Sequence, residues 1–412
     1  MKTLSYTILL LALVCGTFGN LSAQKKFLFD ATKAETAGNA DWVIDEDSSP
    51  QRYPTPPEST VTATTAETYW TGALSAWGIG LVKMGQSVET LPPGIAISYG
   101  SSSNVQDLTH YDVFIVDEPN TPFSSAEKTS ILQFVANGGG LFMISDHGAA
   151  DRNNDGWDAV RVWNDLMRSN SVQSLPFGML LDSTNISETT TNILSSPTDA
   201  ILNGPAGPVT EFKFSNGSTI TIDTTSNPTV RALIWESGYA QGLVKVMVAC
   251  AHFGRGKVVL VGDSSPADDG TGASGNSLYN GWTGDVGLSH ANLHLNASIW
   301  LSQKDSSATT GVRSITTGDR SFSLGQNFPN PFNPSTTIRF AVSERSRVRI
   351  AVYDVLGREV ALLADEETGA GNFEKVWNAN AASGLYFYRF EAVSVADPGR
   401  RFVQVKKMIL LK

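Results

Sequence analysis

Four short apolar runs that each end in aspartate constrain the fold of this chain more than any other feature. They read KFLFD, VFIVD, LFMISD and VVLVGD, at Lys26–Asp30, Val113–Asp117, Leu141–Asp146 and Val258–Asp263. Apolar runs of this length are typical of strands buried on both faces of a parallel sheet. Helical spacing recurs at Thr68–Met84, Ser125–Asn137 and Ser289–Ser302. The pattern predicts an α/β domain with a mostly parallel sheet and helices on both faces.

A β-rich insertion interrupts this alternation before the last apolar run. Strands are expected at Thr210–Ile222 and Val230–Trp235. A hairpin of Val244–His252 and Lys257–Gly262 follows, with its turn at the sequence Gly-Arg-Gly.

The residues after 303 differ in composition. Residues 304–321 are rich in Ser, Thr and Gly, which is typical of a linker. Short β-type runs with turn signals between them follow at Thr336–Val342, Arg347–Val355, Val360–Leu363, Phe373–Trp377, Leu385–Ala392 and Phe402–Leu411. We therefore predict an α/β domain at 24–303, a linker at 304–321 and a small all-β, immunoglobulin-like sandwich at 322–412.

The first 23 residues have the layout of a secretory signal peptide. Lys2 precedes an apolar run, Ile8–Val14, and cleavage is expected after Ala23. Val14 stands where a small residue usually precedes a lipidated cysteine, which argues against acylation of Cys15. No other stretch approaches 18 apolar residues, so we expect no membrane span in the mature chain. Cys250 would then be its one cysteine, without a disulfide partner.

Charge is divided unevenly along the chain. Residues 24–303 hold 14 Lys and Arg against 29 Asp and Glu, whereas residues 304–412 hold 15 against 11. Because nucleic acid binding depends on neutralising phosphates with basic side chains, we expect no nucleic acid partner for the acidic segment.

The C-terminal segment contains three motifs in a fixed order. QNFPNPFNPST begins at Gln326, VYDVLGREV begins at Val352 and SGLYFY begins at Ser383, before a Lys-rich end. These motifs resemble the type A C-terminal sorting domain of type IX secretion system cargo. The resemblance implies export across the outer membrane of a Bacteroidetes-like bacterium by the type IX secretion machinery. It also implies removal of this domain, with release or surface attachment of the rest. A plain ligand-binding sandwich is the alternative.

The pattern at Phe134–His147 and Lys257–Asp263 resembles the class I glutamine amidotransferase-like, flavodoxin-type fold. Active amidotransferases carry a Gly-x-Cys-x-Gly elbow after the corresponding strand. This chain reads Ile-Ser-Asp-His-Gly from Ile144, with Asp146 at the cysteine position, so amidotransferase chemistry is not carried over.

The four strand-end aspartates, Asp30, Asp117, Asp146 and Asp263, are expected to share one edge of the sheet. In open α/β sheets ligands bind beyond the carboxyl ends of the strands. Clustered carboxylates raise one another's pKa, and a divalent cation would neutralise them. The alternative is that each aspartate begins a turn or caps a helix.

The loop after the third run has the spacing of a calcium loop. Asp151, Asn153, Asp155 and Asp158 supply oxygens at close intervals, and Gly156 allows a sharp turn. Val162 stands where an EF-hand has its bidentate Glu, so Asp158 would have to substitute. The alternative is an Asx-turn leading to an N-cap for a helix at 159–169.

Further metal ligands are expected in two places. Asp268 lies in an oxygen-rich loop at 263–272, after the last strand, where binding function is common. His290 and His294 lie four residues apart on a predicted helix, a spacing that suits zinc or another transition metal. The alternative is an ordinary helix capped by Ser289.

His147 is the candidate general base because histidine titrates near neutral pH. Ser264 is a weaker candidate for a nucleophile, and Cys250 lies in an apolar run where a thiol is normally inert. Four tryptophans could stack on a sugar or belong to the core: Trp70, Trp77, Trp157 and Trp282.

Together these features predict a secreted or cell-surface, metal-binding α/β domain that hydrolyses an extracellular polymer or ester. Asp146, His147 and Asp263 are expected nearest the chemistry, with calcium or another divalent metal bound. The alternative is a noncatalytic, calcium-stabilised binding module for glycan or another surface component.

Overall fold

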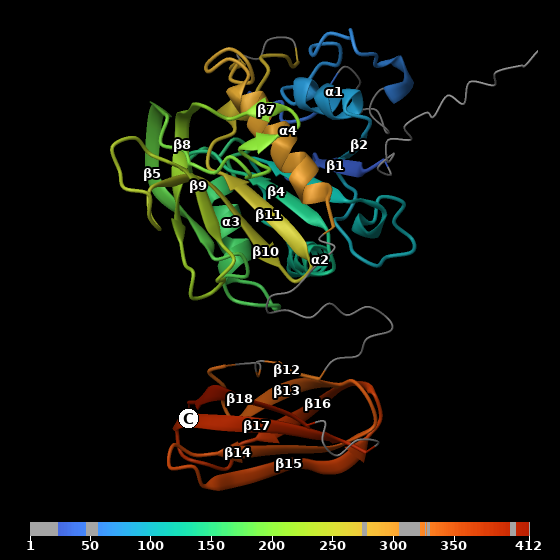
Figure 1. Ribbon diagram of the computed structural model, residues 1–412, viewed down its shortest axis with the longest axis vertical. Coiled ribbons are helices and arrows are strands. Elements are labelled where there is room, and N and C mark those ends of the chain that lie inside the picture. The colour runs from blue at the N-terminus through green and yellow to red at the C-terminus, as the bar shows by residue number, and fades with distance from the viewer. Residues whose placement is uncertain are drawn as a thin grey trace, which may run out of the picture. The chain divides into compact units, whose positions relative to one another are not determined.

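The computed structural model describes residues 24–46, 57–273, 278–304, 322–325, 327, 330–395 and 401–411 (Figure 1). The predicted signal peptide and linker residues 305–321 lie outside these ranges. The chain divides into two compact units, Met1–Asp305 and Ser306–Lys412, called here the large unit and the C-terminal unit.

One nine-stranded mixed sheet forms the large unit, in the order β2-β1-β3-β4-β11-β10-β8-β5, with β9 paired to β10. Five strands are parallel: β2 (Ser87–Leu91), β1 (Lys26–Asp30), β3 (Val113–Asp117), β4 (Gly140–Ile144) and β11 (Gly256–Val261). Four are antiparallel: β10 (Val246–Phe253), β9 (Arg231–Trp235), β8 (Phe212–Ile222) and β5 (Met179–Thr190). The predicted parallel arrangement therefore fits one half of the sheet.

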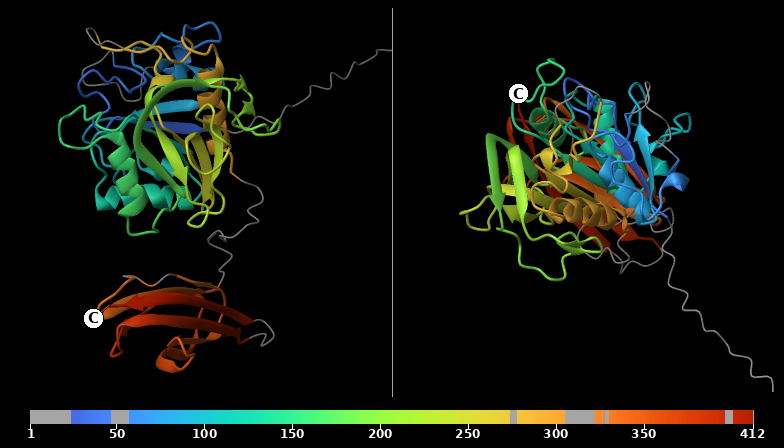
Figure 2. Two further views of the ribbon diagram at one scale, coloured as in Figure 1. Left: turned by 90° about the vertical axis from the view of Figure 1, so that its left-hand side faces the viewer. Right: turned by 90° about the horizontal axis from the view of Figure 1, so that it is seen from above.

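Side chains of the central strands alternate between two cores. In β1, Phe27 and Phe29 pack into one core and Leu28 into the other. The first core includes residues of α1 (Ser75–Lys83) and α4 (Ser289–Ser302), and the second includes residues of α2 (Ser125–Ala136) and α3 (Ala159–Arg168). The left view of Figure 2 shows α4 on the opposite side of the sheet from α2 and α3. Helices on both faces are therefore confirmed.

Short elements connect the main ones. They are the 3-10 helices η1 (Glu58–Thr60), η2 (Leu108–His110) and η3 (Ser265–Ala267), and the strands β6 (Asn203–Gly204) and β7 (Gly207–Pro208). Within the described ranges, no helix is long and apolar enough to cross a membrane.

The C-terminal unit is all β. One sheet holds β12 (Ser323–Leu324), β13 (Ser335–Val342) and β16 (Gly371–Asn378). The other holds β15 (Glu359–Thr368), β14 (Ser346–Tyr353), β17 (Gly384–Ser394) and β18 (Arg401–Leu410). Alternate residues of these strands fill one core, including Ile338, Ile350 and Tyr388. Six strands overlap the six predicted runs, and the unit has the predicted sandwich-like character.

Candidate functional site

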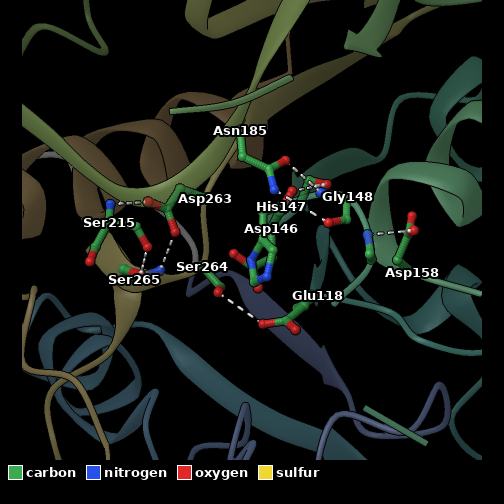
Figure 3. Close-up of polar contacts among 12 residues, drawn as sticks. Glu118, Asp146, His147, Gly148, Asp158, Asn185, Ser215, Asp263, Ser264 and Ser265 are labelled. Carbon is green, nitrogen blue, oxygen red and sulfur yellow. Dashed lines mark hydrogen bonds and ion pairs between the residues drawn. The ribbon is translucent and has the colours of Figure 1, made fainter. Parts of the chain in front are cut away.

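A pocket of about 150 Å³ lies where the loops after β4 and β11 meet. Its walls combine charged, hydroxyl, amide and aromatic side chains: Asn39, Trp42, Asp146, His147, Arg152, Ser215, Asn216, Ser264, Ser265, Asp268, Leu278 and Tyr279. The carboxyl edge of the parallel strands is where such sheets bind ligands. The pocket is therefore the candidate site (Figure 3).

Asp146 and His147 lie side by side in this pocket. Nδ1 of His147 lies 3.0 Å from Oδ2 of Asp146, which is almost fully buried, whereas the His147 side chain is 28% exposed. The Asp146 carboxylate raises the pKa of His147 above its ordinary value, although burial acts in the opposite direction. The adjacent amide of Gly148 donates to Asn185 Oδ1 of β5 at 3.0 Å, so an unpredicted strand supports this loop.

The sequence analysis missed two charged residues of the site, Arg152 and Glu118. Nε of Arg152 donates to Oε1 of Glu118, and its Nη2 lies 3.1 Å from Glu118 Oε2 and 3.2 Å from Asp146 Oδ2. Glu118 is fully buried and follows β3 directly. Arg152 therefore places a positive charge beside Glu118 and beside Asp146, and Asp146 is one of the carboxylates for which the sequence analysis had expected a divalent cation.

Ser264 connects the loop after β11 to Glu118. Its hydroxyl donates to Glu118 Oε2 at 2.9 Å (Figure 3). Burial, and after it the negative charge of Asp146, raises the pKa of Glu118 to about 8, although Arg152 acts in the opposite direction. The carboxylate next to Ser264 is therefore more basic than an exposed glutamate.

Asp263 lies beneath the pocket and joins β11 to β8. Its Oδ2 accepts from the Ser215 amide and its Oδ1 accepts from the Ser265 amide at 2.9 Å. Burial raises its pKa to about 7, and Asp146 adds to the rise. The backbone is close-packed here, because a Cβ on Gly262 would lie 1.9 Å from the carbonyl oxygen of Ser218. Asp263 thus holds the wall of the pocket in place.

Three of the four strand-end aspartates share this neighbourhood. Asp117 is buried, and neither of its carboxylate oxygens has a hydrogen-bond partner in the described structure. Burial raises its pKa well above normal, and Glu118, Asp268, Asp146 and Asp263 add to the rise. The carboxylates of Asp117, Asp146 and Asp263 therefore interact electrostatically, as expected from their strand ends.

Asp30 stands apart from this group. Its Oδ1 accepts from the Thr32 amide at 3.2 Å, and its charged neighbours are Lys33 and Glu35. Burial raises its pKa to about 6. Asp30 is the last residue of β1, as predicted, but does not line the pocket.

Asp268 lines the pocket through the loop after η3. Its carboxylate accepts from the amides of Gly270 at 2.8 Å and Tyr279 at 3.1 Å. Burial raises its pKa to about 7. These contacts place Tyr279 on the pocket wall.

The oxygens of the predicted calcium loop hold a turn. Asp151 accepts from the amides of Asp155 at 3.0 Å and Gly156 at 2.7 Å. Asp158 accepts from the Arg161 amide at 2.8 Å and caps α3, which confirms the N-cap. The Asn153 side-chain amide donates to Asp155 Oδ2 at 3.0 Å. In the described residues, no three His, Cys, Asp or Glu side chains are grouped to hold a metal ion. Calcium binding stays a prediction.

His290 lies in a buried position of α4. Its Nε2 accepts from the Lys213 amide at 2.9 Å, and its Nδ1 lies 2.7 Å from the Gly281 carbonyl oxygen. Burial lowers the pKa of His290 to about 4. His294 Nδ1 lies 2.8 Å from the His290 carbonyl oxygen, so the two rings do not turn toward a common ligand through this nitrogen. A metal at His290 would have to displace a backbone contact.

Most of the candidate aromatic and thiol groups belong to the core. Trp70, Trp77 and Trp282 are at most 1% exposed and pack in the first core. Burial raises the pKa of Cys250 to about 11, in agreement with an inert thiol. Trp42 and Tyr279 line the pocket instead, and the sequence analysis had singled out neither.

Comparisons with known proteins identify the C-terminal unit. Residues 326–403 match the family described as secretion system C-terminal sorting domain. Dimeric latent PorU from Porphyromonas gingivalis is 27% identical over 24% of this chain and 10% of its own, with a TM-score of 0.19. The sorting domain marks a secreted or cell-surface protein that the type IX secretion machinery exports.

Two other solved structures align with longer parts of the chain. The N-terminal domain of mmIFT52 is 14% identical over 68% of this chain and 98% of its own, with a TM-score of 0.40. A thua-like protein from Parabacteroides merdae is 12% identical over 71% and 95%, with a TM-score of 0.33. No curated protein matches the chain. These comparisons do not support the predicted amidotransferase-like fold.

Proposed function

We propose that the large unit is an extracellular hydrolase that cleaves an ester or a polymer bond, with His147 as its general base. The observation that carries the proposal is the 3.0 Å pair between Asp146 Oδ2 and His147 Nδ1 in the pocket. His147 Nδ1 has no hydrogen-bond partner in the described structure, so the proposal requires the ring to reorient until Nδ1 donates to Asp146. Nε2 is then left to accept a proton from water or a hydroxyl. Asp146 acts here as a positioning residue.

Arg152 supports this assignment electrostatically. Its Nη2 contacts both Asp146 and Glu118, so a positive charge lies beside the carboxylate that pairs with His147. The large unit meets its substrate outside the cell, because the sorting domain directs export. A divalent metal is a separate component of the proposal, and a chelator tests it directly.

The test is a hydrolase panel with the full mature chain. Ester, glycoside, peptide and phosphoester substrates are incubated with added divalent metals and, in parallel, with chelator. For any substrate that is cleaved, His147→Gln should lower turnover by roughly 10²-fold or more, since that is the usual contribution of a general base. His110→Gln is the matched control, because His110 is exposed and does not line the pocket. An absence of cleavage across the panel contradicts the proposal.

The second candidate is a noncatalytic, calcium-stabilised module that binds glycan or another surface component. Trp42 and Tyr279 favour it, because both line the pocket beside amide and hydroxyl groups, a combination that suits sugar binding. Glycan binding measured by calorimetry, without any turnover, would support this candidate over the hydrolase.

A further inference from the structure

Ser264 differs from its neighbour Ser265 in what its hydroxyl contacts. The Ser264 hydroxyl donates to the Glu118 carboxylate at 2.9 Å, whereas the Ser265 hydroxyl donates to the carbonyl oxygen of Ser215 at 3.3 Å. A carboxylate can remove the proton of a hydroxyl, and a peptide carbonyl cannot. Both serines line the same pocket, and the Ser264 hydroxyl is the one that contacts a carboxylate.

Glu118 is held firmly enough to act on Ser264. Both of its oxygens contact Arg152, from Nε and Nη2, and the side chain is fully buried. Its backbone is in the left-handed region, with φ of 44°, and its amide donates to the Ile144 carbonyl oxygen at 3.2 Å. Fixed geometry between nucleophile and base is what such a pair requires.

The pocket is small. Its volume of about 150 Å³ is below the several hundred Å³ typical of sites that enclose a drug-sized ligand. Ser264 is 1% exposed, so it meets the pocket from the floor. A group that reaches Ser264 must therefore be short, although the molecule that carries it can be large and remain outside.

We propose that Ser264 is a nucleophile, that Glu118 is its base, and that the site removes short acyl groups, such as acetyl, from esters. This inference rests on the proposed hydrolytic function. His147 serves the second half of the reaction, in which water releases the acyl group.

The steps balance as an ordinary two-stage ester hydrolysis. Oγ of Ser264 bonds to the acyl carbon while its proton passes to Glu118, and the ester C–O bond then breaks. The departing alkoxide takes the proton from Glu118 and leaves as the alcohol. Water then attacks the acyl carbon while His147 accepts its proton. The bond between the acyl carbon and Ser264 Oγ breaks, and the proton passes from His147 to Oγ. The products are one alcohol and one short carboxylic acid.

The experiment combines covalent labelling with kinetics on the full mature chain. An alkyl fluorophosphonate is used as the probe, and labelled peptides are mapped by mass spectrometry. Turnover is compared for p-nitrophenyl acetate and p-nitrophenyl octanoate. We expect an adduct on Ser264, at least about tenfold higher kcat/KM for the acetate, and a loss of about 10³-fold or more in Ser264→Ala. Ser265→Ala should still form the adduct.

Each outcome of the experiment tests a separate part of the proposal. Ester hydrolysis without an adduct, an adduct on another residue, or turnover retained in Ser264→Ala overturns the nucleophile and leaves the proposed function in place, with water activated by His147. Equal rates for the two esters overturn the restriction to short acyl groups. If the wild type shows a cooperative melt but neither hydrolyses esters nor labels, the inference fails. A cleaved glycoside or peptide in the broader panel would then preserve the proposed function.

Discussion

The two units of this chain place their charged side chains in different environments. In the large unit, Glu118 and Asp146 are buried and converge on Arg152. In the C-terminal unit, pairs such as Arg347 with Asp365 lie on the surface, with side chains 70% and 33% exposed. Exposed pairs add little stability, whereas a buried charge without its partner is strongly unfavourable. The large unit therefore tolerates energetically unfavourable buried charges at one edge of its sheet, and we place its function at that edge.

The largest expected effect concerns export. Deletion of residues 322–412 should abolish delivery to the surface or medium and trap the large unit in the periplasm of the native host, because the sorting domain carries the export signal. Fractionation with immunoblotting measures this. Surface delivery of the truncated chain at the normal level would contradict the assignment of export to the C-terminal unit.

Removal of the half-buried Arg152 and of the exposed Arg347 tests the difference between the two charge environments directly. Arg152→Ala should destabilise the large unit by about 3–5 kcal/mol, since it leaves two buried carboxylates without their cation. Arg347→Ala should cost the C-terminal unit only about 0–1 kcal/mol. Peptide-resolved hydrogen exchange reads the two units separately. A similar loss of stability in both variants would contradict the difference between the two charge environments.

Asp146→Asn tests the effect of Asp146 on His147 by measuring how turnover depends on pH. Turnover should fall by roughly 10²-fold, because the amide no longer orients a basic His147. His147 must be neutral to accept a proton, so activity is lost as pH falls through its pKa. Asp146 raises that pKa, so the acid limb of the pH profile should move to lower pH in the variant. Residual turnover is followed from pH 4 to 9, a range set by the unperturbed histidine pKa of about 6.5.

Asp112→Asn is the matched control for this substitution. Asp112 pairs with Lys25 at 3.2 Å, just before β3 and away from the pocket. Its variant should keep the wild-type pH profile. An acid limb that stays in place in Asp146→Asn would show that another group titrates.

The smallest expected effect concerns calcium. If the 151–158 loop binds the ion, calcium should raise the melting temperature of the large unit, by linkage to a site formed only in the folded chain. Each kcal/mol gained corresponds to roughly 2–4 °C for a unit of this size. Asp151→Ala combined with Asp155→Ala should abolish the increment. Superimposable melts in calcium and in chelator would leave the loop as a turn.

Sequence patterns predicted the strands better than they predicted the site. β1 and β3 have the expected bounds because continuous apolar runs mark strands buried on both faces. β5 was missed because five of its twelve residues are polar and exposed. Its role depends on pairing with β8, which local pattern cannot reveal.

The missed site residues show the same limit. Arg152 lies inside a loop with calcium spacing, and its guanidinium has a role only because the chain brings Glu118, 34 residues away, beside it. Ser264 had a plausible strand-end position, but its carboxylate partner is 146 residues distant. Residue types and spacing predicted carboxylates at this edge of the sheet, whereas the contacts of Arg152 with Glu118 and Asp146 depend on tertiary structure. Metal binding stays a prediction.

The close approach of β8 and the segment that follows β11 provides an internal control for mutational scans. A side chain at Gly262 would meet the Ser218 carbonyl oxygen at 1.9 Å, and one at Gly217 would meet Cβ of Asp263 at 2.4 Å. Neither glycine lines the pocket. In a library of variants selected for activity, depletion at these two positions reports failure to fold, whatever substrate is offered. If depletion at Ser264 or His147 depends on the substrate, it can then be attributed to loss of catalytic activity.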